Sequence, residues 1–330
     1  MSLSARLQRI WYDGASTPFW LAALVPVYRA LRQLDLSMYR IGLRRSLRVA
    51  APVVVVGNLT VGGSGKTPLV IALVDALRAR GFKPAIVSRG YGGTQRAAVV
   101  LDDAPDPARY GDEPSLMRRR TGVEVAVGRD RAEAATLLVR RGANVIIADD
   151  GLQNPSLARD IEICVIDGQR RFGNEQLLPA GPLREPLSRL ETMDFRICNG
   201  ARAERGEIPM RLAGEVAVSV ASASRTRALA SFARQRIHAV AAIGNPGRFF
   251  TGLQARGIEV IAHPFPDHHA FVAGDIAFAD TLPVLMTEKD AIKCVAFAGP
   301  DVWCVPVSAD VPATFIDELV ARLRVVRLQT

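Results

Sequence analysis

The stretch that most constrains the fold is residues 52–68, PVVVVGNLTVGGSGKTP. A β-branched run at 53–56 leads into a glycine-rich turn, which ends in GKT at the start of an apolar-periodic segment. This order predicts a strand, a phosphate-binding loop and a helix, because backbone N–H groups ahead of a helix N-terminus form a cavity for polyphosphate. The predicted nucleotide-binding residues are Thr60, Val61, Gly62, Gly63, Ser64, Gly65, Lys66 and Thr67.

In loops of this kind the lysine contacts the terminal phosphates and the hydroxyl group binds Mg²⁺. The strict pattern GxxxxGK[ST] would place glycine where this chain has Thr60, and Gly62 and Gly63 come instead just ahead of Ser64. An ordinary glycine-rich turn is the alternative, but GK[ST] after a four-residue β-branched strand rarely arises by chance. We therefore take nucleotide binding as the working hypothesis.

Strand-like runs alternate with helical segments along the chain, which predicts the α/β class. With 330 residues and 49% hydrophobic content, the chain can bury two cores. Residues 201–235 differ from the preceding strand and helix patterns, because polar and charged residues are interspersed around one short alternating run, and we place a linker there. We expect a nucleotide-binding domain at 1–205, and the linker with a smaller α/β domain at 206–330. The four cysteines show no CxxC spacing, which favours buried free thiols in a reducing compartment.

The first 50 residues combine aromatic side chains with an arginine-rich helical pattern. Up to residue 48 they carry eight arginines against two aspartates, and the whole chain has a formal net charge of +9. Their apolar run is about half the roughly 20 residues that a spanning helix needs, and no cleavage site for a signal peptide follows it. The pattern favours an interfacial segment on an anionic membrane surface. The alternative is two helices that pack on the core and expose a basic face.

Acidic residues follow predicted strands at two places. Asp149 and Asp150 end the apolar run 145–148, an arrangement typical of an aspartate that holds Mg²⁺. Two adjacent carboxylates repel each other unless a cation or a proton lies between them, so the pair favours a metal site over a capped turn. Asp112 and Glu113 precede a helix, where they either belong to the site or only complement the helix dipole.

Loops at the carboxyl ends of parallel strands form the ligand crevice of a doubly wound sheet. Arg89 and Tyr91 lie in such a loop, and they either face phosphate or sugar or belong to a flexible turn. Arg184 and Glu185 lie in the proline-rich segment 178–186, which is either a stiff substrate-contacting loop or a plain linker.

The second half contains the polar loop motif Asp267-His268-His269. A carboxylate beside an imidazole suits proton handling at neutral pH. Metal capture by these three side chains is the competing interpretation, although no further spaced ligand pair is evident.

Taken together, the motifs GNLTVGGSGKTP, SRGYGG, GDEP, GRDR, DDGLQ, LPAGPLREP, DHHAF and MTEKDAIKC run nearly end to end. With the aromatic N-terminal segment, they make the chain resemble the tetraacyldisaccharide 4′-kinase (lipid A 4′-kinase) family of Gram-negative bacteria. The family commonly has His after DDGxQ, whereas this chain has Asn154, to which we assign no catalytic role.

The resemblance implies ATP-dependent phosphorylation of the 4′-hydroxyl of a tetraacyl-glucosamine disaccharide 1-phosphate, with ATP and Mg²⁺ as cofactors. It also implies two α/β/α domains hinged about a linker, the first of them P-loop NTPase-like, and a peripheral location at the cytoplasmic face of the inner membrane. The partners would be the acylated disaccharide and an anionic membrane surface, with no nucleic acid.

The resemblance also implies roles for individual residues. Asp112 would be the base, supported by His268, and we expect domain closure to bring the two together and raise the basicity of Asp112. Lys66 would neutralise the moving phosphoryl group, while Asp149 and Asp150 would assist the base and hold the metal's water. The metal ligands would be Thr67 and Asp150. The substrate would contact Arg89, Tyr91, Glu113, Arg131, Arg184 and Glu185, since arginine pairs bidentately with phosphate.

Two other functions compete with this one. A GTP-driven switch or metallochaperone would need a guanine-reading NKxD, but the lysine of the TEKD sequence at 287–290 comes one place too late. A nucleic-acid-dependent ATPase would fit the positive charge. Against it, the basic residues concentrate in an aromatic N-terminal helix, and no nucleic-acid-binding motif is evident.

Overall fold

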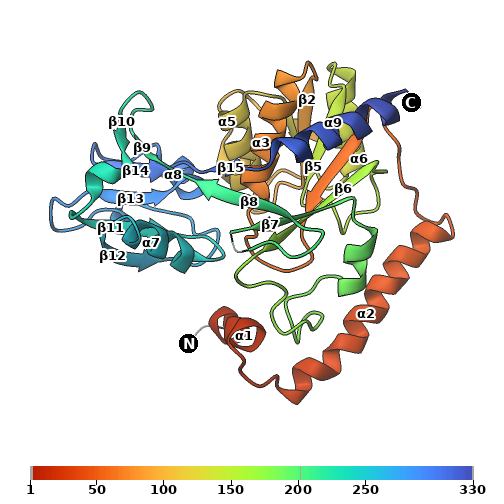
Figure 1. Cartoon of the computed structure of the whole chain (residues 1–330), viewed down its shortest axis with the longest axis horizontal. Coiled ribbons are helices and arrows are strands. Elements are labelled where there is room, and N and C mark those ends of the chain that lie inside the picture. Colours follow the sequence, from red (N-terminus) through yellow and green to blue (C-terminus); the bar gives the residue numbers. More distant parts are fainter. Residues whose placement is uncertain (1–2, 201, 329–330) are drawn as a thin grey trace.

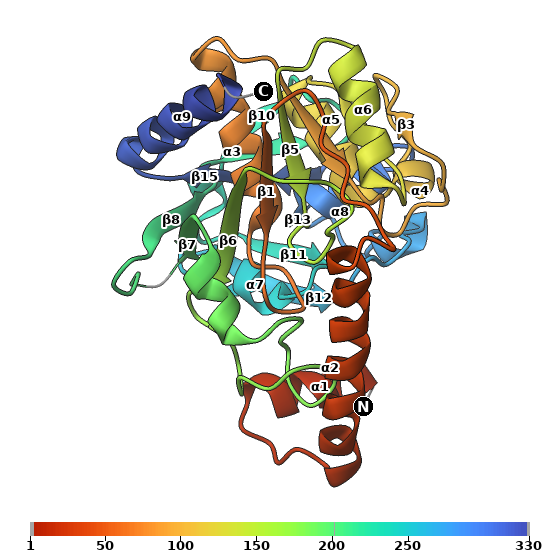
Figure 2. The same ribbon diagram turned by 90° about the vertical axis from the view of Figure 1, so that its right-hand side faces the viewer.

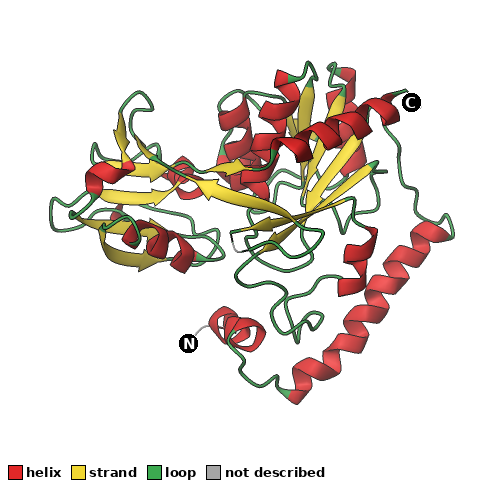
Figure 3. Cartoon of the chain, viewed as in Figure 1, coloured by secondary structure: helices red, strands yellow, loops and turns green. Residues whose placement is uncertain are grey.

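The computed structural model describes residues 3–200 and 202–328, which form two α/β units and a pair of N-terminal helices (Figures 1 and 3). Each unit has a central sheet with a hydrophobic core on either face, so the predicted α/β class is confirmed. Residues 1, 2, 201, 329 and 330, which the predicted domains and linker include, lie outside the described residues.

The larger sheet has nine strands in the order β15-β8-β7-β6-β1-β5-β2-β4-β3. Its neighbours pair in parallel except at the two edges, where β3 and β15 are antiparallel. The central strands β1 and β5 are buried along their whole length and apolar except for Asp149 at the end of β5, as expected for parallel strands covered on both faces. The strands are β1 (Val53–Gly57), β2 (Pro84–Ser88), β3 (Val99–Val100), β4 (Val125–Val127), β5 (Val145–Asp149), β6 (Ile161–Asp167), β7 (Phe195–Asn199), β8 (Ile208–Ala213) and β15 (Ser308–Asp310).

Helices cover both faces of this sheet. The core on one face contains side chains from α3 (Lys66–Ala79), α5 (Asp112–Thr121) and α9 (Ala313–Arg327). The core on the other face contains α6 (Arg131–Arg140) and the segment around the 3₁₀ helix η1 (Leu187–Thr192). The short helix α4 (Pro107–Tyr110) leads into α5.

The smaller sheet has six strands in the order β10-β9-β14-β13-β11-β12. Helices α7 (Pro246–Gln254) and α8 (Glu288–Cys294) contribute to separate cores on its two faces. All four cysteines of the chain are buried. The remaining elements are β9 (Val216–Ser219), β10 (Thr226–Ala228), β11 (Arg236–Ala241), β12 (Glu259–Pro264), β13 (Val284–Thr287), β14 (Val302–Val305) and the 3₁₀ helices η2 (Leu229–Phe232) and η3 (Ala273–Asp275).

The division between the units differs from the expected boundary at residue 205. Strand β8, which falls within the predicted linker, pairs with β7, and the chain returns after β14 to add β15 and α9 to the larger unit. The reason is burial: Met210, Phe315 and Leu319 are part of the larger unit's core. We therefore correct the boundary. The small unit comprises residues 216–305, inserted between β8 and β15 of the large unit.

The N-terminal segment forms α1 (Leu3–Tyr12) and α2 (Phe19–Arg40). Figure 2 shows α2 extending away from both sheets, and only its inner face packs on the protein, through residues such as Leu21, Val25 and Tyr28. Within residues 3–200 and 202–328, no helix has the length and apolar character needed to cross a membrane.

Candidate active site

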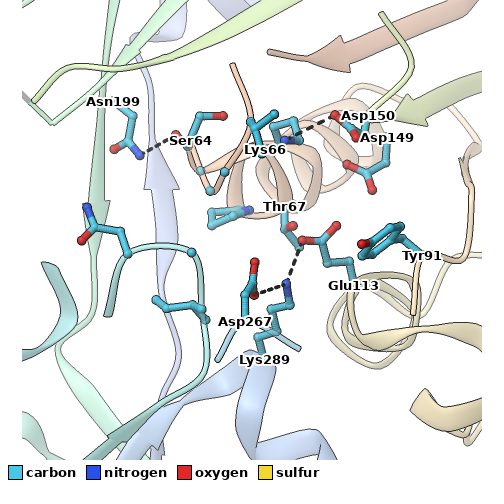
Figure 4. A pocket seen from close by; sticks show the side chains of 18 of the residues that line it. Ser64, Lys66, Thr67, Tyr91, Glu113, Asp149, Asp150, Asn199, Asp267 and Lys289 are labelled. Atoms are coloured by element: carbon cyan, nitrogen blue, oxygen red, sulfur yellow. Dashed lines mark hydrogen bonds and ion pairs between the residues drawn. The ribbon is translucent and has the colours of Figure 1, made fainter. Parts of the chain in front are cut away.

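A cleft of about 1750 Å³ lies between the two units. The large unit lines it with loops that follow β1, β2 and β5, and the small unit lines it with loops that follow β11, β12 and β13. In both sheets these are the carboxyl ends of parallel strands, where open α/β sheets bind their ligands. Figure 4 shows side chains of the phosphate loop, the acidic pair and the small unit around this cleft.

The predicted phosphate loop connects β1 to α3, and its residues Val61 to Thr67 line the cleft. Lys66 begins the helix, and its Nζ lies 3.1 Å from Asn58 Oδ1 and 3.4 Å from Asp150 Oδ1. Thr60 is placed differently from the rest of the loop, because it is buried and forms a β-bridge with Leu183 away from the cleft lining.

Asp149 and Asp150 lie at the tip of β5, as the sequence predicts, but their environments are opposite. Asp149 is buried, accepts a hydrogen bond from Ser88 Oγ at 3.2 Å, and has a second oxygen with no partner. Burial, together with the nearby charges of Glu113 and Asp150, raises the pKa of Asp149 to about 7. Burial alone would raise the pKa of Asp150 as well. The positive charges of Lys66 and Arg184 outweigh burial, so the net shift in the pKa of Asp150 is downward.

The donor set around this pair fits a magnesium ion. Hard oxygen ligands from one or two carboxylates, completed by substrate phosphates, are the usual protein contribution to Mg²⁺ sites. Asp149 offers its unpartnered buried oxygen, Asp150 a second carboxylate, and Thr67 a hydroxyl group on the cleft lining. In the part of the chain that the structure describes, no group of three or more His, Cys, Asp or Glu side chains forms a complete metal site.

Asp112 and His268 come from different units and contact each other. Asp112 begins α5 in the large unit, and its Oδ2 lies 3.1 Å from His268 Nδ1 and 3.6 Å from Lys293 Nζ of the small unit. Burial raises the pKa of Asp112, but His268 and Lys293 outweigh it, so that the net shift is downward. The pair is therefore in contact in this structure, and its hydrogen bond lowers the pKa of Asp112. That domain closure joins the two residues stays a prediction.

Lys289 joins Glu113 to the small unit in the same region. Its Nζ lies 3.1 Å from Glu113 Oε1 and 3.8 Å from Asp267 Oδ1 (Figure 4). Burial lowers the pKa of Lys289, but the two carboxylates outweigh it and raise the pKa, which keeps the amine charged. From the sequence, this lysine was weighed as a guanine-reading residue and was not predicted to belong to the site. Its position directly after β13, at the carboxyl edge of a parallel sheet, is the signal that could have placed it here.

The histidines of the DHH motif face different partners. His269 Nε2 lies 2.9 Å from Asp275 Oδ2 within the small unit, whereas His268 faces Asp112 across the cleft. The competing metal interpretation would need both imidazoles to converge, and this geometry does not favour it.

Of the predicted substrate residues, all except Glu185 line the cleft. Arg89 and Tyr91 are exposed on the cleft lining, with the Tyr91 ring edge-on to His268 at 5.1 Å between centroids. Arg131 also lines the cleft. It is buried, and its Nε and Nη1 have no hydrogen-bond partner. Burial lowers the pKa of this guanidinium. Arg184 donates to both oxygens of Asp150, at 3.1 and 3.0 Å.

Glu185 and Asn154 have local partners instead. Glu185 is buried outside the cleft lining and accepts hydrogen bonds from Arg32 and Gln153, each at 3.1 Å. Asn154 lines the cleft, but its Oδ1 accepts from the backbone and hydroxyl of Ser156 at 2.9 and 2.7 Å, which closes a turn.

The fold and the cleft define a P-loop nucleotide-binding protein of the phosphoryl-transfer class. Comparison with known families makes this more specific, because residues 17–324 match the model of the family described as tetraacyldisaccharide-1-P 4′-kinase. The chain belongs to this family.

Relatives and a solved structure agree with this assignment. The chain is 48% identical to tetraacyldisaccharide 4′-kinase of Stenotrophomonas maltophilia, over 95% of either chain, and 48% identical to that of Xanthomonas euvesicatoria, over 95% of this chain and 94% of the relative. It also resembles the crystal structure of LpxK from Aquifex aeolicus in complex with ATP. The TM-score is 0.75 at 27% identity, covering 92% of this chain and 98% of that one.

Proposed function

We propose that the chain transfers the γ-phosphate of ATP to the 4′-hydroxyl of a tetraacyl-glucosamine disaccharide 1-phosphate, a step of lipid A biosynthesis. The observation that carries this proposal is the convergence of three groups on one cleft in a member of this kinase family. These groups are the phosphate loop with Lys66, the acidic pair Asp149 and Asp150, and the contact between Asp112 and His268.

Phosphoryl transfer depends on positioning and on neutralising the charge of the moving group, with little covalent chemistry by the protein. The backbone N–H groups of the phosphate loop and the N-terminal end of α3 would bind the triphosphate. Lys66 would contact its terminal phosphates, since this lysine already faces the cleft at the head of the helix.

Thr67, Asp149 and Asp150 would hold Mg²⁺ with the phosphate oxygens of the nucleotide. When bound there, the ion offsets negative charge on the transferring group. Arg184 would keep Asp150 in place, because its guanidinium contacts both carboxylate oxygens.

Asp112 would accept the hydrogen bond of the attacking hydroxyl, and His268 would hold Asp112 in position from the opposite side of the cleft. The lowered pKa of Asp112 fits this role, because a loose transition state needs an oriented nucleophile more than it needs a strong base. Glu113, the next residue of α5, would assist Asp112 in positioning the acceptor. Lys289 would hold Glu113 through their hydrogen bond.

Arg131, Arg89 and Tyr91 would bind the acceptor. A buried guanidinium with unpartnered nitrogens is well suited to an anionic ligand, because burial without a partner costs free energy that a phosphate would recover. Arg184 and Glu185 would support the acceptor site without contacting the acceptor. Arg184 contacts Asp150 of the acidic pair, and Glu185 contacts Arg32 of α2.

We further propose that α2 binds the anionic surface of the inner membrane at its cytoplasmic face, where an acylated acceptor would be presented. Apolar side chains at helical spacing form a stripe on the outer face of α2, which comprises Trp20, Leu24, Val27, Leu31 and Leu34. An exposed apolar stripe beside arginine residues is the pattern of interfacial helices. The inner face supports the active-site loop, because Tyr28 Oη donates to the backbone oxygen of Arg184 at 2.8 Å.

The test is transfer of radiolabelled phosphate from ATP to the acylated disaccharide 1-phosphate by the purified full chain. We expect labelled lipid from the wild type and none above background from Lys66→Ala. Labelling of lipid that is equal in both would refute the proposed site. ATP hydrolysis that nucleic acid stimulates and acylated disaccharide does not would refute the proposed acceptor.

A further inference from the structure

A buried amide lies beneath the phosphate loop and connects it to the small unit. Asn199, the last residue of β7, is completely buried. Its Nδ2 donates to the backbone oxygen of Ser64 at 2.8 Å, and its Oδ1 accepts from Arg248 Nη2 at 3.0 Å (Figure 4 shows the contact with Ser64). Arg248 belongs to α7, so the chain of contacts crosses from the small unit to the phosphate loop.

The contact with Ser64 determines how the peptide between Ser64 and Gly65 is oriented. In a trans peptide the N–H points away from the carbonyl oxygen. Because Asn199 holds the carbonyl of Ser64 on its own side, the N–H of Gly65 is directed to the opposite side, where a phosphate would accept its hydrogen bond. A peptide turned the other way would present a carbonyl oxygen to an anion, which is repulsive.

Arg248 in turn determines how the amide of Asn199 is oriented. An amide side chain has one donor end and one acceptor end, and a guanidinium only donates. Arg248 therefore holds Oδ1 toward the small unit, which leaves Nδ2 facing Ser64. Arg248 Nη1 also lies 3.9 Å from Asp167 Oδ2, at the tip of the neighbouring strand β6.

The packing around Gly65 leaves little space for another arrangement. A Cβ atom at this position would lie 2.4 Å from Asn199 Nδ2, and the residue has a φ of +96°. The two units also approach each other at a second place here, because a Cβ at Gly244 of the small unit would lie 3.1 Å from the backbone nitrogen of Gly63.

We propose that Asn199 and Arg248 are positioning residues for nucleotide binding, through which the small unit holds the phosphate loop in its anion-binding conformation. Asn199 acts on the loop directly, and Arg248 acts through Asn199. The proposal goes beyond the proposed kinase activity, and it rests on that function only in taking ATP as the ligand.

The test measures the Kd of a fluorescent ATP analogue, together with kcat and the KM of each substrate. We expect Asn199→Ala and Asn199→Asp each to weaken nucleotide binding by about tenfold, while the KM of the lipid stays unchanged. Asn199→Asp is informative because it keeps the acceptor for Arg248 and removes the donor to Ser64. We expect Arg248→Met to weaken nucleotide binding less, and Arg248→Lys to restore part of the loss.

The double variant Asn199→Ala with Arg248→Met should bind nucleotide no more weakly than Asn199→Ala alone. Arg236→Met, an exposed arginine of the same unit, is the matched control and should bind as the wild type does. The proposal is overturned if Asn199→Ala and Asn199→Asp bind nucleotide normally, or if the two effects multiply, which would mean that Arg248 contacts nucleotide itself. If the Asn199 variants do not fold, normal binding by Arg248→Met overturns it. If the wild type transfers no phosphate but the variants show these effects on nucleotide binding, the proposed kinase activity is refuted and this inference still holds.

Discussion

The two units meet at one cleft, but they contribute different kinds of groups to it. The large unit supplies the phosphate loop and the carboxylates of Glu113, Asp149 and Asp150 to the cleft lining, and its Asp112 contacts His268, which also lines the cleft. The small unit supplies groups that pair with those carboxylates from across the cleft: His268 and Lys293 face Asp112, and Lys289 faces Glu113.

This difference suggests a division of labour in which the large unit holds the nucleotide and the small unit sets the charge and orientation of the catalytic acids. Coulombic attraction between half-buried groups is much stronger than between exposed ones, so these contacts matter for both position and protonation. If the division is correct, loss of the phosphate-loop lysine should abolish turnover. Loss of a small-unit group that pairs with these carboxylates should slow turnover and leave nucleotide binding in place.

The largest effect is expected from Lys66→Ala, which removes the cation of the phosphate loop. Turnover should fall by about 10³-fold, the upper range for loss of one preorganised charge-stabilising donor. The measurement is the steady-state rate of phosphate transfer at saturating lipid. Lys83→Ala, an exposed lysine of the same unit, serves as the control and should have normal turnover.

A smaller effect is expected from His268→Ala in the small unit. Turnover should fall by about 10²-fold, because Asp112 loses the partner that holds it, while the Kd of ATP should stay within about twofold of the wild type. His269→Ala is the matched control, since His269 pairs with Asp275 inside the small unit. Equal losses of turnover in His268→Ala and His269→Ala would contradict the specific role of the contact between His268 and Asp112.

A third prediction concerns the stripe on α2, which belongs to neither sheet. Leu31→Glu should weaken binding of the chain to vesicles of anionic phospholipid by about tenfold or more, because an inserted leucine contributes about 1.5–3 kcal/mol. Co-sedimentation with vesicles measures the effect. Val325→Glu, at another exposed apolar position, on α9, should bind vesicles normally. If both variants bind alike, α2 is not the membrane-binding element.

The smallest effect is expected from Asp149→Asn, measured as Tm in the absence of nucleotide and metal. The pKa of Asp149 is about 7 in the folded chain and lies above the value of an unfolded aspartate, so the native state binds the extra proton. Stability should therefore fall as pH rises from about 4 to 7. Asp149→Asn should raise Tm at pH 8 by about 2–4 °C and raise it less at pH 5. The exposed control Asp301→Asn should show no such dependence, and a Tm gain independent of pH would contradict the assignment.

The parts of the fold that could be predicted are those with a strong local pattern. The run of four valines, the glycine-rich turn and Lys66 lie within 14 residues of sequence, and they form β1, the phosphate loop and the start of α3 as expected. Asp149 and Asp150 could be placed for the same reason, since an apolar run followed by an acid marks a strand tip.

The parts that could not be predicted depend on contacts between distant segments. Strand β8 is partly exposed and pairs with β7 and β15, and β15 lies about 100 residues away along the chain, so its short pattern resembles a linker. The sequence pattern of α9 predicts a helix, but it does not predict whether that helix packs on the large unit or on the small unit. Lys289 and Arg248 were missed because their hydrogen-bond partners Glu113 and Asn199 lie in the other unit, far away along the chain.

The measurement that most directly tests a site shared by both units is the single-turnover rate of phosphate transfer in a double-mutant cycle of Asp112→Asn and His268→Ala. If the two residues act as one unit across the cleft, each single variant slows transfer and the double variant is no slower than the slower single one. Effects that multiply in the double variant, or a single variant that transfers phosphate at the wild-type rate, would contradict the account.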